Sequence, residues 1–396
     1  MTPADRIPVV TSIDDRLKTT SICLGIGYGS RHDPPGRGGL AHVLEHVLMS
    51  APLPGAGPLV QHVERLGGSA NAETGLERML FHVQVDAEDA DEVAALLLRA
   101  VLEPGPDAAT LETERAAVLQ ELAAAAADPM DTVQDAVLAA LFPGHPLGRP
   151  VGGTVAEITA MDLEAVLDGH RTALLTSPMA LAVVGPRVPR GLDRIAGAAM
   201  PAAVRDRPGF PLGPVAAGEP AWPDEFAWVM VGGRSTGLAD GNRHRYAVLS
   251  NLMGASASSV LYRELRVAAG LAYSFQSWDG GYAEAGGWRV LVGVDSGNGP
   301  EAVRIVLREL DVLATEGPGD TDLDAARRHT RMSVLRDTES PLEHARLLAT
   351  RALSHRNGWD LDTELREIAA VTRDDIRRAA SSLRSGLVTV VRPEAQ

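Results

Sequence analysis

The chain has 396 residues, of which 45% are hydrophobic and 22% charged, and a formal net charge of −15. This length exceeds one ordinary core and predicts two domains of about 200 residues each. The composition is that of a globular protein, not a disordered one. The negative charge argues against nucleic acid or an anionic membrane as the main partner. An acidic protein could favour basic peptide substrates, but solubility alone explains such a charge.

Two further features limit the setting in which the protein works. The single cysteine, Cys23, excludes an internal disulfide framework and a zinc site made of cysteines, and its alternating surroundings predict a buried strand position. Residues 1–10 lack the basic and apolar segments of a signal peptide. No apolar run approaches the roughly 20 residues of a membrane helix. We therefore expect a cytoplasmic protein with no membrane partner.

The first half of the chain alternates between strand-like and helix-like patterns. Residues 9–10, 20–28, 69–74, 79–85 and 179–184 are predicted strands. Predicted helices cover residues 40–49, 60–66, 87–102, 107–127, 129–141 and 158–172. This order predicts an α+β domain in which long helices pack on a mainly antiparallel sheet.

The second half repeats the first after a Pro/Gly-rich linker at residues 201–223. Residues 111–129 match residues 323–341 at a constant offset, because 323 − 111 and 341 − 129 both equal 212. We therefore expect two homologous domains, a catalytic one at 1–200 and a degenerate one at 224–396.

The degenerate copy lacks the chemical groups described next. It has Ala247, Ser250, Asn251 and Ser333 at the corresponding places.

The motif His42-Val-Leu-Glu45-His46 lies in the predicted helix at 40–49. Residues four apart share one face of a helix, so both imidazoles can reach one tetrahedral zinc. Glu45 projects to the same side, where a carboxylate can move a proton between water and a leaving amine. The order H-x-x-E-H is a known catalytic signature. On its own it is also compatible with two packing or capping histidines.

Two carboxylates on the helix at 107–127 are candidates to complete the site. Glu114 and Glu121 are seven residues apart and share one face. If this helix crosses the motif helix, Glu121 can bind the metal and Glu114 can orient a histidine ligand. The alternative is a solvent-exposed acidic face.

The whole chain resembles the pitrilysin/insulinase-type zinc metallopeptidases (inverzincins), in particular the short two-domain branch that includes the mitochondrial processing peptidase β subunit. Members carry H-x-x-E-H, then a glutamate some 75 residues later and a second glutamate seven residues before that one. Here 121 − 46 is 75 and 121 − 114 is 7. Residues 29–31 and 67–74 also match the family pattern.

The resemblance implies one zinc ion per chain and a role for each matching residue. His42, His46 and Glu121 would be its ligands, Glu114 the supporting carboxylate and Glu45 the catalytic base. An edge strand containing Asn71 and Ala72 would pair with extended substrate.

In the second half, Arg266 and Tyr273 match the family's Arg and Tyr that reach the substrate carbonyl. A guanidinium and a phenol are suitable oxyanion donors. Taken alone, they would be a surface charge and a core aromatic.

We therefore expect a zinc-dependent endopeptidase that cleaves unfolded peptides or precursor segments inside a dimeric chamber, each chain forming half of a clamshell. A homodimer suffices, because both sets of residues occur in this chain, and a heterodimer with a related subunit stays open. In the homodimer we expect Arg266 and Tyr273 to be donated by the partner chain; the sequence does not show whether they act in trans. The alternative is a catalytically silent scaffold or partner subunit. The sequence does not identify the natural substrate or the cleavage site.

Overall fold

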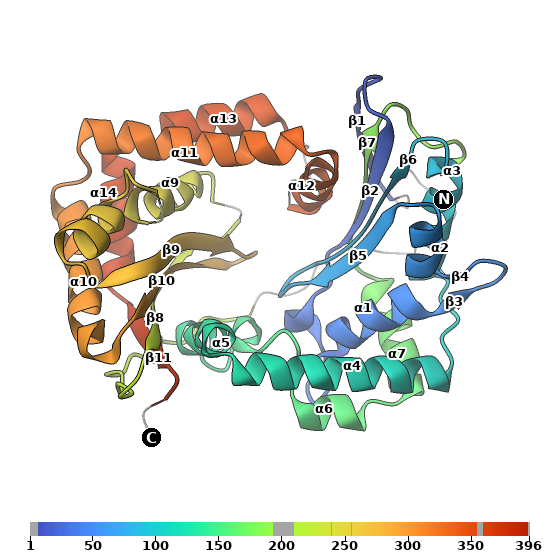
Figure 1. Cartoon of the computed structure of the whole chain (residues 1–396), viewed down its shortest axis with the longest axis horizontal. Helices are drawn as coiled ribbons and strands as arrows, with labels where there is room; N and C mark the ends of the chain where they lie inside the picture. Colours follow the sequence, from blue (N-terminus) through green and yellow to red (C-terminus); the bar gives the residue numbers. More distant parts are fainter. Residues whose placement is uncertain (1–6, 193–209, 239, 255, 355–358, 395–396) are drawn as a thin grey trace. The chain divides into compact units, whose positions relative to one another are not determined.

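The computed structural model describes residues 7–192, 210–238, 240–254, 256–354 and 359–394. It is an α+β protein with two compact units, each built around a mainly antiparallel sheet (Figure 1). The expected fold class is confirmed. Each unit is described separately below.

The first unit contains the described residues of 1–123, 150–208 and 336–359. Its five-stranded sheet has the order β1-β7-β2-β6-β5, and only the β1–β7 pair is parallel. The strands are β1 (Val9–Ile13), β2 (Thr19–Ile26), β5 (Ser69–Thr74), β6 (Met79–Asp86) and β7 (Met179–Gly185). A two-stranded hairpin consists of β3 (Pro52–Leu53) and β4 (Gly57–Pro58).

Alternation along β2 separates two hydrophobic clusters in this unit. Ile22, Leu24 and Ile26 belong to the main core, whereas Cys23 belongs to a smaller cluster on the other face. Helices of the first unit are α1 (Leu40–Ser50), α2 (Leu59–Arg65), α3 (Ala90–Leu102), α4 (Ala108–Ala127), α6 (Val155–Ala160), α7 (Leu163–Gly169) and α12 (Pro341–Ser354). The main core includes α1, α2 and α3, and the smaller cluster includes α12.

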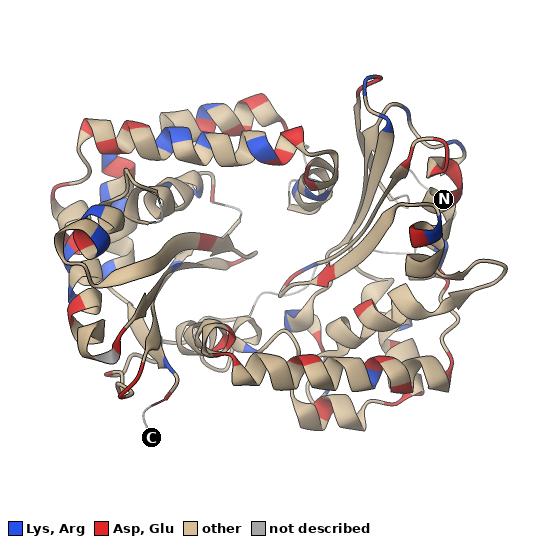
Figure 2. Cartoon of the chain, in the orientation of Figure 1, with Lys and Arg blue, Asp and Glu red and all other residues tan. Residues whose placement is uncertain are grey.

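The second unit contains the described residues of 124–149, 209–335 and 360–396. Its antiparallel sheet has the order β11-β8-β10-β9. Those strands are β8 (Ala227–Thr236), β9 (Ala272–Gly281), β10 (Ala285–Val294) and β11 (Val388–Arg392). Its helices are α5 (Pro129–Leu141), α9 (His244–Met253), α10 (Gly299–Thr315), α11 (Asp320–Glu339), α13 (Leu361–Ala370) and α14 (Arg373–Arg384). Helices α10, α11 and α13 carry both acidic and basic residues, whereas the strands carry few charges (Figure 2).

The two units repeat one topology. Without β1, the first sheet reads β7-β2-β6-β5, which matches β11-β8-β10-β9 strand for strand. Helices α4 and α11 have the same length, and their first residues, Ala108 and Asp320, are 212 positions apart. The offset predicted from the sequence is therefore the offset between equivalent helices.

The packing units differ from the contiguous ranges 1–200 and 224–396. Helix α5 follows α4 in the first half but packs on β8 and β11, and α12 follows α11 in the second half but packs on β2 and β7. Each half of the chain thus supplies one helix to the sheet of the other half. Helical periodicity marks an apolar face but does not identify the sheet that covers it, so the sequence did not predict this exchange.

One predicted helix is wrong in detail. The segment 158–172 is interrupted after α6, because Asp162 caps a new helix by accepting a hydrogen bond from the Ala165 amide. The predicted linker at 201–223 lies partly outside the described residues, and its described part, 210–223, forms no helix or strand. Within the described residues, no helix is long and apolar enough to cross a membrane.

Candidate metal centre

Helix α1 carries the H-x-x-E-H motif, and a buried aspartate holds its first turn. Asp33 is 3% exposed and accepts hydrogen bonds from the Gly39 amide (2.9 Å), the Ala41 amide (3.1 Å) and the Tyr28 hydroxyl (2.8 Å). These amides lack partners inside the helix, so Asp33 caps it from a distant loop. Burial raises the pKa of Asp33 to about 7, although the three donors act in the opposite direction.

Three side chains converge where α1 meets α4. His42 Nε2 and His46 Nε2 lie 3.2 Å and 3.4 Å from Glu121 Oε2, and all three donor atoms lie within 4.8 Å of one another. Glu114 lies seven residues before Glu121 on α4, about two helical turns, and therefore on the same face at this helix crossing. The structure therefore brings together the ligand set expected from the sequence.

Glu114 supports His46 from the other side of its ring. Glu114 Oε2 is 3.1 Å from His46 Nδ1, and both side chains are mostly buried. A proton on Nδ1 that bonds this carboxylate leaves the lone pair of Nε2 free for a metal. His42 lacks such support among the described residues, because its buried Nδ1 makes no hydrogen bond there.

The electrostatic surroundings suit neutral imidazoles and a basic carboxylate. Burial lowers the pKa of His42, and the adjacent His46 acts in the same direction. Burial also raises the pKa of Glu45 above its usual range. A neutral imidazole is the form that binds a metal, and a carboxylate of raised pKa is a better proton acceptor.

The donor set fits zinc. Two imidazole nitrogens and one carboxylate oxygen form a known catalytic ligand set, and ligands about 2.1 Å from a tetrahedral ion lie about 3.4 Å apart. The measured separations from Glu121 Oε2 agree with that edge length. The Glu121 side chain is 55% exposed, so the group is open to solvent on one side, as a catalytic site with a free fourth position requires.

The strand expected to bind substrate is at the edge of its sheet. β5 pairs only with β6 in the first unit, and Asn71 is exposed on it while Ala72 packs into the main core. Its outer backbone groups have no partner strand within that sheet, which is the arrangement that β-augmentation uses.

Arg266 and Tyr273 lie together in the second unit. The Arg266 guanidinium carbon is 4.1 Å from the centroid of the Tyr273 ring and 5.1 Å from that of Tyr262. Tyr273 is 79% exposed, so it is not the core aromatic of the alternative interpretation. The Tyr273 side chain is open to solvent, whereas Arg266 is half-buried against the two rings.

The second unit has a counterpart of the metal centre without its chemistry. Asn251 on α9 donates a hydrogen bond to Thr330 Oγ1 on α11 (3.1 Å), and Ser250 bonds the Tyr246 carbonyl. The equivalent helices are thus linked by a hydrogen bond where the first unit has the His/His/Glu group.

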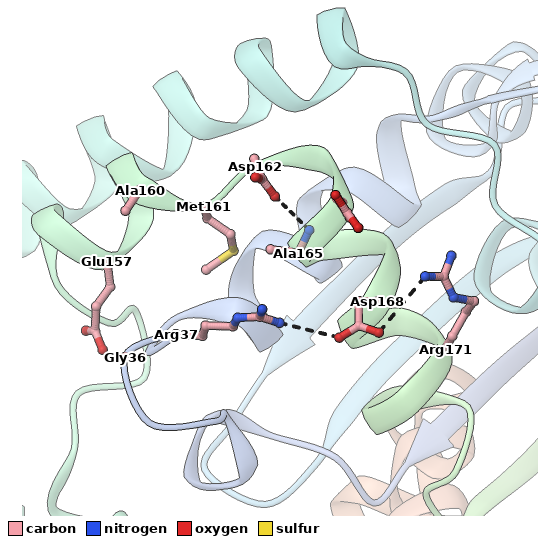
Figure 3. A pocket seen from close by; sticks show the side chains of 10 residues that line it. Gly36, Arg37, Glu157, Ala160, Met161, Asp162, Ala165, Asp168 and Arg171 are labelled. Carbon is pink, nitrogen blue, oxygen red and sulfur yellow. Dashed lines mark hydrogen bonds and ion pairs between the residues drawn. The ribbon is translucent and has the colours of Figure 1, made fainter.

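A separate pocket of about 370 Å³ lies beside α6 and α7 (Figure 3). Arg37 and Arg171 approach Asp168 from two sides, at 3.5 Å and 4.0 Å, and Asp162 caps α7. Asp162 and Glu157 accept hydrogen bonds from the backbone amides of Ala165 and Gly38, and the pocket contains none of the residues predicted for the site.

Sequence reasoning missed two supports of α1. One is Asp33; its distance from the motif gives no signal that it is a cap. The other is a close backbone approach: a Cβ at Gly39, whose φ is +84°, would lie 2.5 Å from the Gly152 carbonyl oxygen. The Gly-Gly pairs at 38–39 and 152–153 are visible in the sequence, but their contact is not.

Comparison with known proteins assigns the chain to one family. The family model described as insulinase (peptidase family M16) matches residues 9–155, and the model described as the peptidase M16 inactive domain matches residues 206–329. The chain belongs to peptidase family M16. The matched ranges agree with one half of the chain that carries the motif and one half that lacks it.

Its relatives include proteins named as zinc proteases. An uncharacterized zinc protease of Mycobacterium tuberculosis is 28% identical over 387 residues, covering 95% of this chain and 88% of the relative. The mitochondrial-processing peptidase subunit beta of Blastocladiella emersonii is 23% identical, with 96% and 85% covered. A crystal structure of a peptidase M16 inactive domain from Pseudomonas fluorescens has the same fold, with a TM-score of 0.85, 18% identity and coverage of 100% and 97%.

Proposed function

We propose that this protein is a zinc-dependent endopeptidase that cleaves unfolded peptides or precursor segments. The observation that carries the proposal is the group His42, His46 and Glu121, at separations that suit zinc, with Glu45 beside it. Its M16 relatives named as zinc proteases support the same activity.

The metal site, Glu45 and Glu114 of the first unit have different roles in the reaction. Zinc, when bound, supplies a Lewis acid that polarises the scissile carbonyl and makes water more acidic. Glu45 accepts the proton of the attacking water and delivers it to the leaving amine nitrogen as the C–N bond breaks. Glu114 keeps His46 in the tautomer that presents Nε2 to the metal.

The substrate is held in extended form. The outer edge of β5, at Asn71 and Ala72, bonds the peptide backbone, so the site selects unfolded segments over folded proteins. Arg266 and Tyr273 donate hydrogen bonds to the carbonyl oxygen as it becomes an oxyanion.

We further propose that two chains form the working chamber. A homodimer suffices, and a heterodimer with a related subunit is the alternative; in either case Arg266 and Tyr273 act on the substrate bound by the other chain. A cytoplasmic location remains our expectation. The second candidate function is a catalytically silent scaffold. The match to the model described as the peptidase M16 inactive domain favours it, but only for residues 206–329.

The experiment that tests this proposal is chelation and reconstitution. Cleavage of an unstructured fluorogenic peptide should stop after zinc removal and return with about one equivalent of zinc per chain. Cleavage that survives complete removal of metal would exclude the mechanism. Metal-binding protein that cleaves no peptide, alone or with a related subunit, would favour the scaffold.

A further inference from the structure

The edge strand β5 carries a charged group that the mechanism does not use. Arg346 on α12 donates a hydrogen bond from Nη2 to Glu73 Oε2 (2.6 Å) and from Nη1 to both oxygens of Glu343 (2.7 Å each). We call Glu73, Arg346 and Glu343 the β5 triad. Two carboxylates and one guanidinium leave it with a net charge of −1.

The β5 triad lies on the face of the sheet opposite the metal centre. Leu80, the cross-strand neighbour of Glu73, belongs to the small cluster with α12, whereas Ala72 belongs to the core that contains α1. Successive residues of a strand alternate between faces. A peptide added to the outer edge of β5 therefore directs every second side chain toward α12.

One of those side chains must lie next to Glu73. Residues directly opposite each other on neighbouring strands have Cβ atoms about 5 Å apart. The side chains of Glu73 and Glu343 are each 44% exposed, so both carboxylates are accessible from solvent. A long cationic side chain at that place can reach either of them, and an acidic one meets net negative charge.

We propose that the β5 triad is a specificity-determining subsite that selects an arginine or lysine in the substrate, at the position opposite Glu73 on the bound strand. The inference rests on the proposed peptidase function, because it takes β5 as the substrate-binding edge. The selected residue is adjacent in the peptide to residues whose side chains face α1 and Glu45.

The structural alternative is that the β5 triad only fastens α12 to the sheet. The two roles predict different changes in the preference for a cationic residue when one charge of the triad is removed. Glu73→Gln removes a negative charge and should weaken the preference for a cation, whereas Arg346→Gln leaves two unopposed carboxylates and should strengthen it. A purely structural triad is broken by either change, so both variants would then shift peptide recognition in the same direction.

The test scans one position at a time in an unstructured ten-residue peptide, comparing arginine, norleucine and glutamate. Cleavage is measured with the wild-type chain, and binding with Glu45→Gln, which cannot cleave but keeps the edge strand. At one position arginine should exceed norleucine by about 2- to 5-fold, and the difference should shrink at high salt. The ratio of the arginine value to the norleucine value should fall toward one in Glu73→Gln and rise in Arg346→Gln. Glu112→Gln, an exposed change on α4, should leave this ratio unchanged.

The outcomes separate this inference from the proposed function. Cleavage with no arginine preference at any position, or equal shifts in both triad variants, would overturn the subsite and leave the peptidase intact. Selective binding by Glu45→Gln without cleavage by the wild-type chain would support the subsite and contradict the peptidase. Absence of both binding and cleavage would refute both.

Discussion

Glu112 and Glu114 lie two residues apart on α4 and have different partners. Glu114 is 16% exposed and contacts His46 Nδ1, whereas Glu112 is 67% exposed and pairs with Arg115. Removing the charge of Glu114 weakens the support of a ligand histidine, an effect typically about 10- to 100-fold in metal affinity. We expect Glu114→Gln to lose zinc affinity by that factor in a competition titration with a chelator. Glu112→Gln is the matched control and should bind as the wild type does; equal affinities for all three proteins would contradict the role of Glu114.

Asp33 links the stability of α1 to pH. The pKa of Asp33 is about 7 in the fold against an ordinary value of 3.8, so between these pH values the folded state holds a proton that the unfolded state has lost. The contribution of Asp33 to the free energy of unfolding is therefore largest near pH 4, falls as pH rises, and levels off above pH 7. The non-ionising variant Asp33→Asn lacks this fall.

Denaturant unfolding of both proteins without metal, at pH 4 to 8, measures the effect. The free energy of unfolding of the wild type, minus that of Asp33→Asn, should decrease as pH rises through this range. A pH-independent difference would show that Asp33 ionises normally in the fold.

The motif residues were readable from the sequence because helix geometry alone relates them. Spacings of four and seven place His42 with His46, and Glu114 with Glu121, on shared faces. Asp33 is eight residues from Ala41, and nothing in the intervening sequence marks it as a cap. Arg346 could not be predicted, since it is 273 residues from Glu73 and only the fold brings the two together. The Asn251–Thr330 bond was not predicted for the same reason, although the sequence aligned Asn251 with a ligand histidine.

Helix α5 packs closely on the second sheet at a glycine. A Cβ at Gly232 would lie 2.8 Å from Val137 Cγ2 and 3.3 Å from Leu141 Cδ1. Overpacking costs about 1–3 kcal/mol, which exceeds the ~0.4–1 kcal/mol that a Gly→Ala change can return through the unfolded chain. We expect Gly232→Ala to lower the free energy of unfolding with zinc affinity unchanged.

Gly241→Ala is the control for that substitution, because a Cβ there meets nothing within 4 Å. Thermal unfolding followed by calorimetry compares the two variants. If Gly232→Ala is as stable as Gly241→Ala, α5 does not pack on β8 as described.

Most elements of the first half were predictable from the sequence, and their packing partners were not. The pattern 69–74 marked β5 to the residue, and the offset of 212 related α4 to α11. The exchange of α5 and α12 between sheets is set by long-range packing, which local periodicity does not encode. The break between α6 and α7 was missed because Asp162 fits a helix interior as readily as a cap when its neighbours are unknown.

The proposed dimer makes a prediction about mixed chains. Glu45→Gln lacks the base and Arg266→Ala lacks an oxyanion donor, so each should be inactive alone. If Arg266 acts on substrate bound by the other chain, a heterodimer of the two variants has one intact site. A statistical 1:1 mixture is half heterodimers, so about a quarter of wild-type activity should return. No recovery after verified subunit exchange would show that each chain uses its own arginine.

The most direct measurement pairs zinc content with peptide cleavage for the wild type and Glu45→Gln. The variant keeps His42, His46 and Glu121 and removes only the base. We predict about one zinc per chain in both proteins, cleavage by the wild type alone, and a loss in the variant of at least the ~10²-fold that general-base catalysis supplies. Equal cleavage by both proteins, or no zinc in either, would contradict the assignment of this group as the catalytic centre.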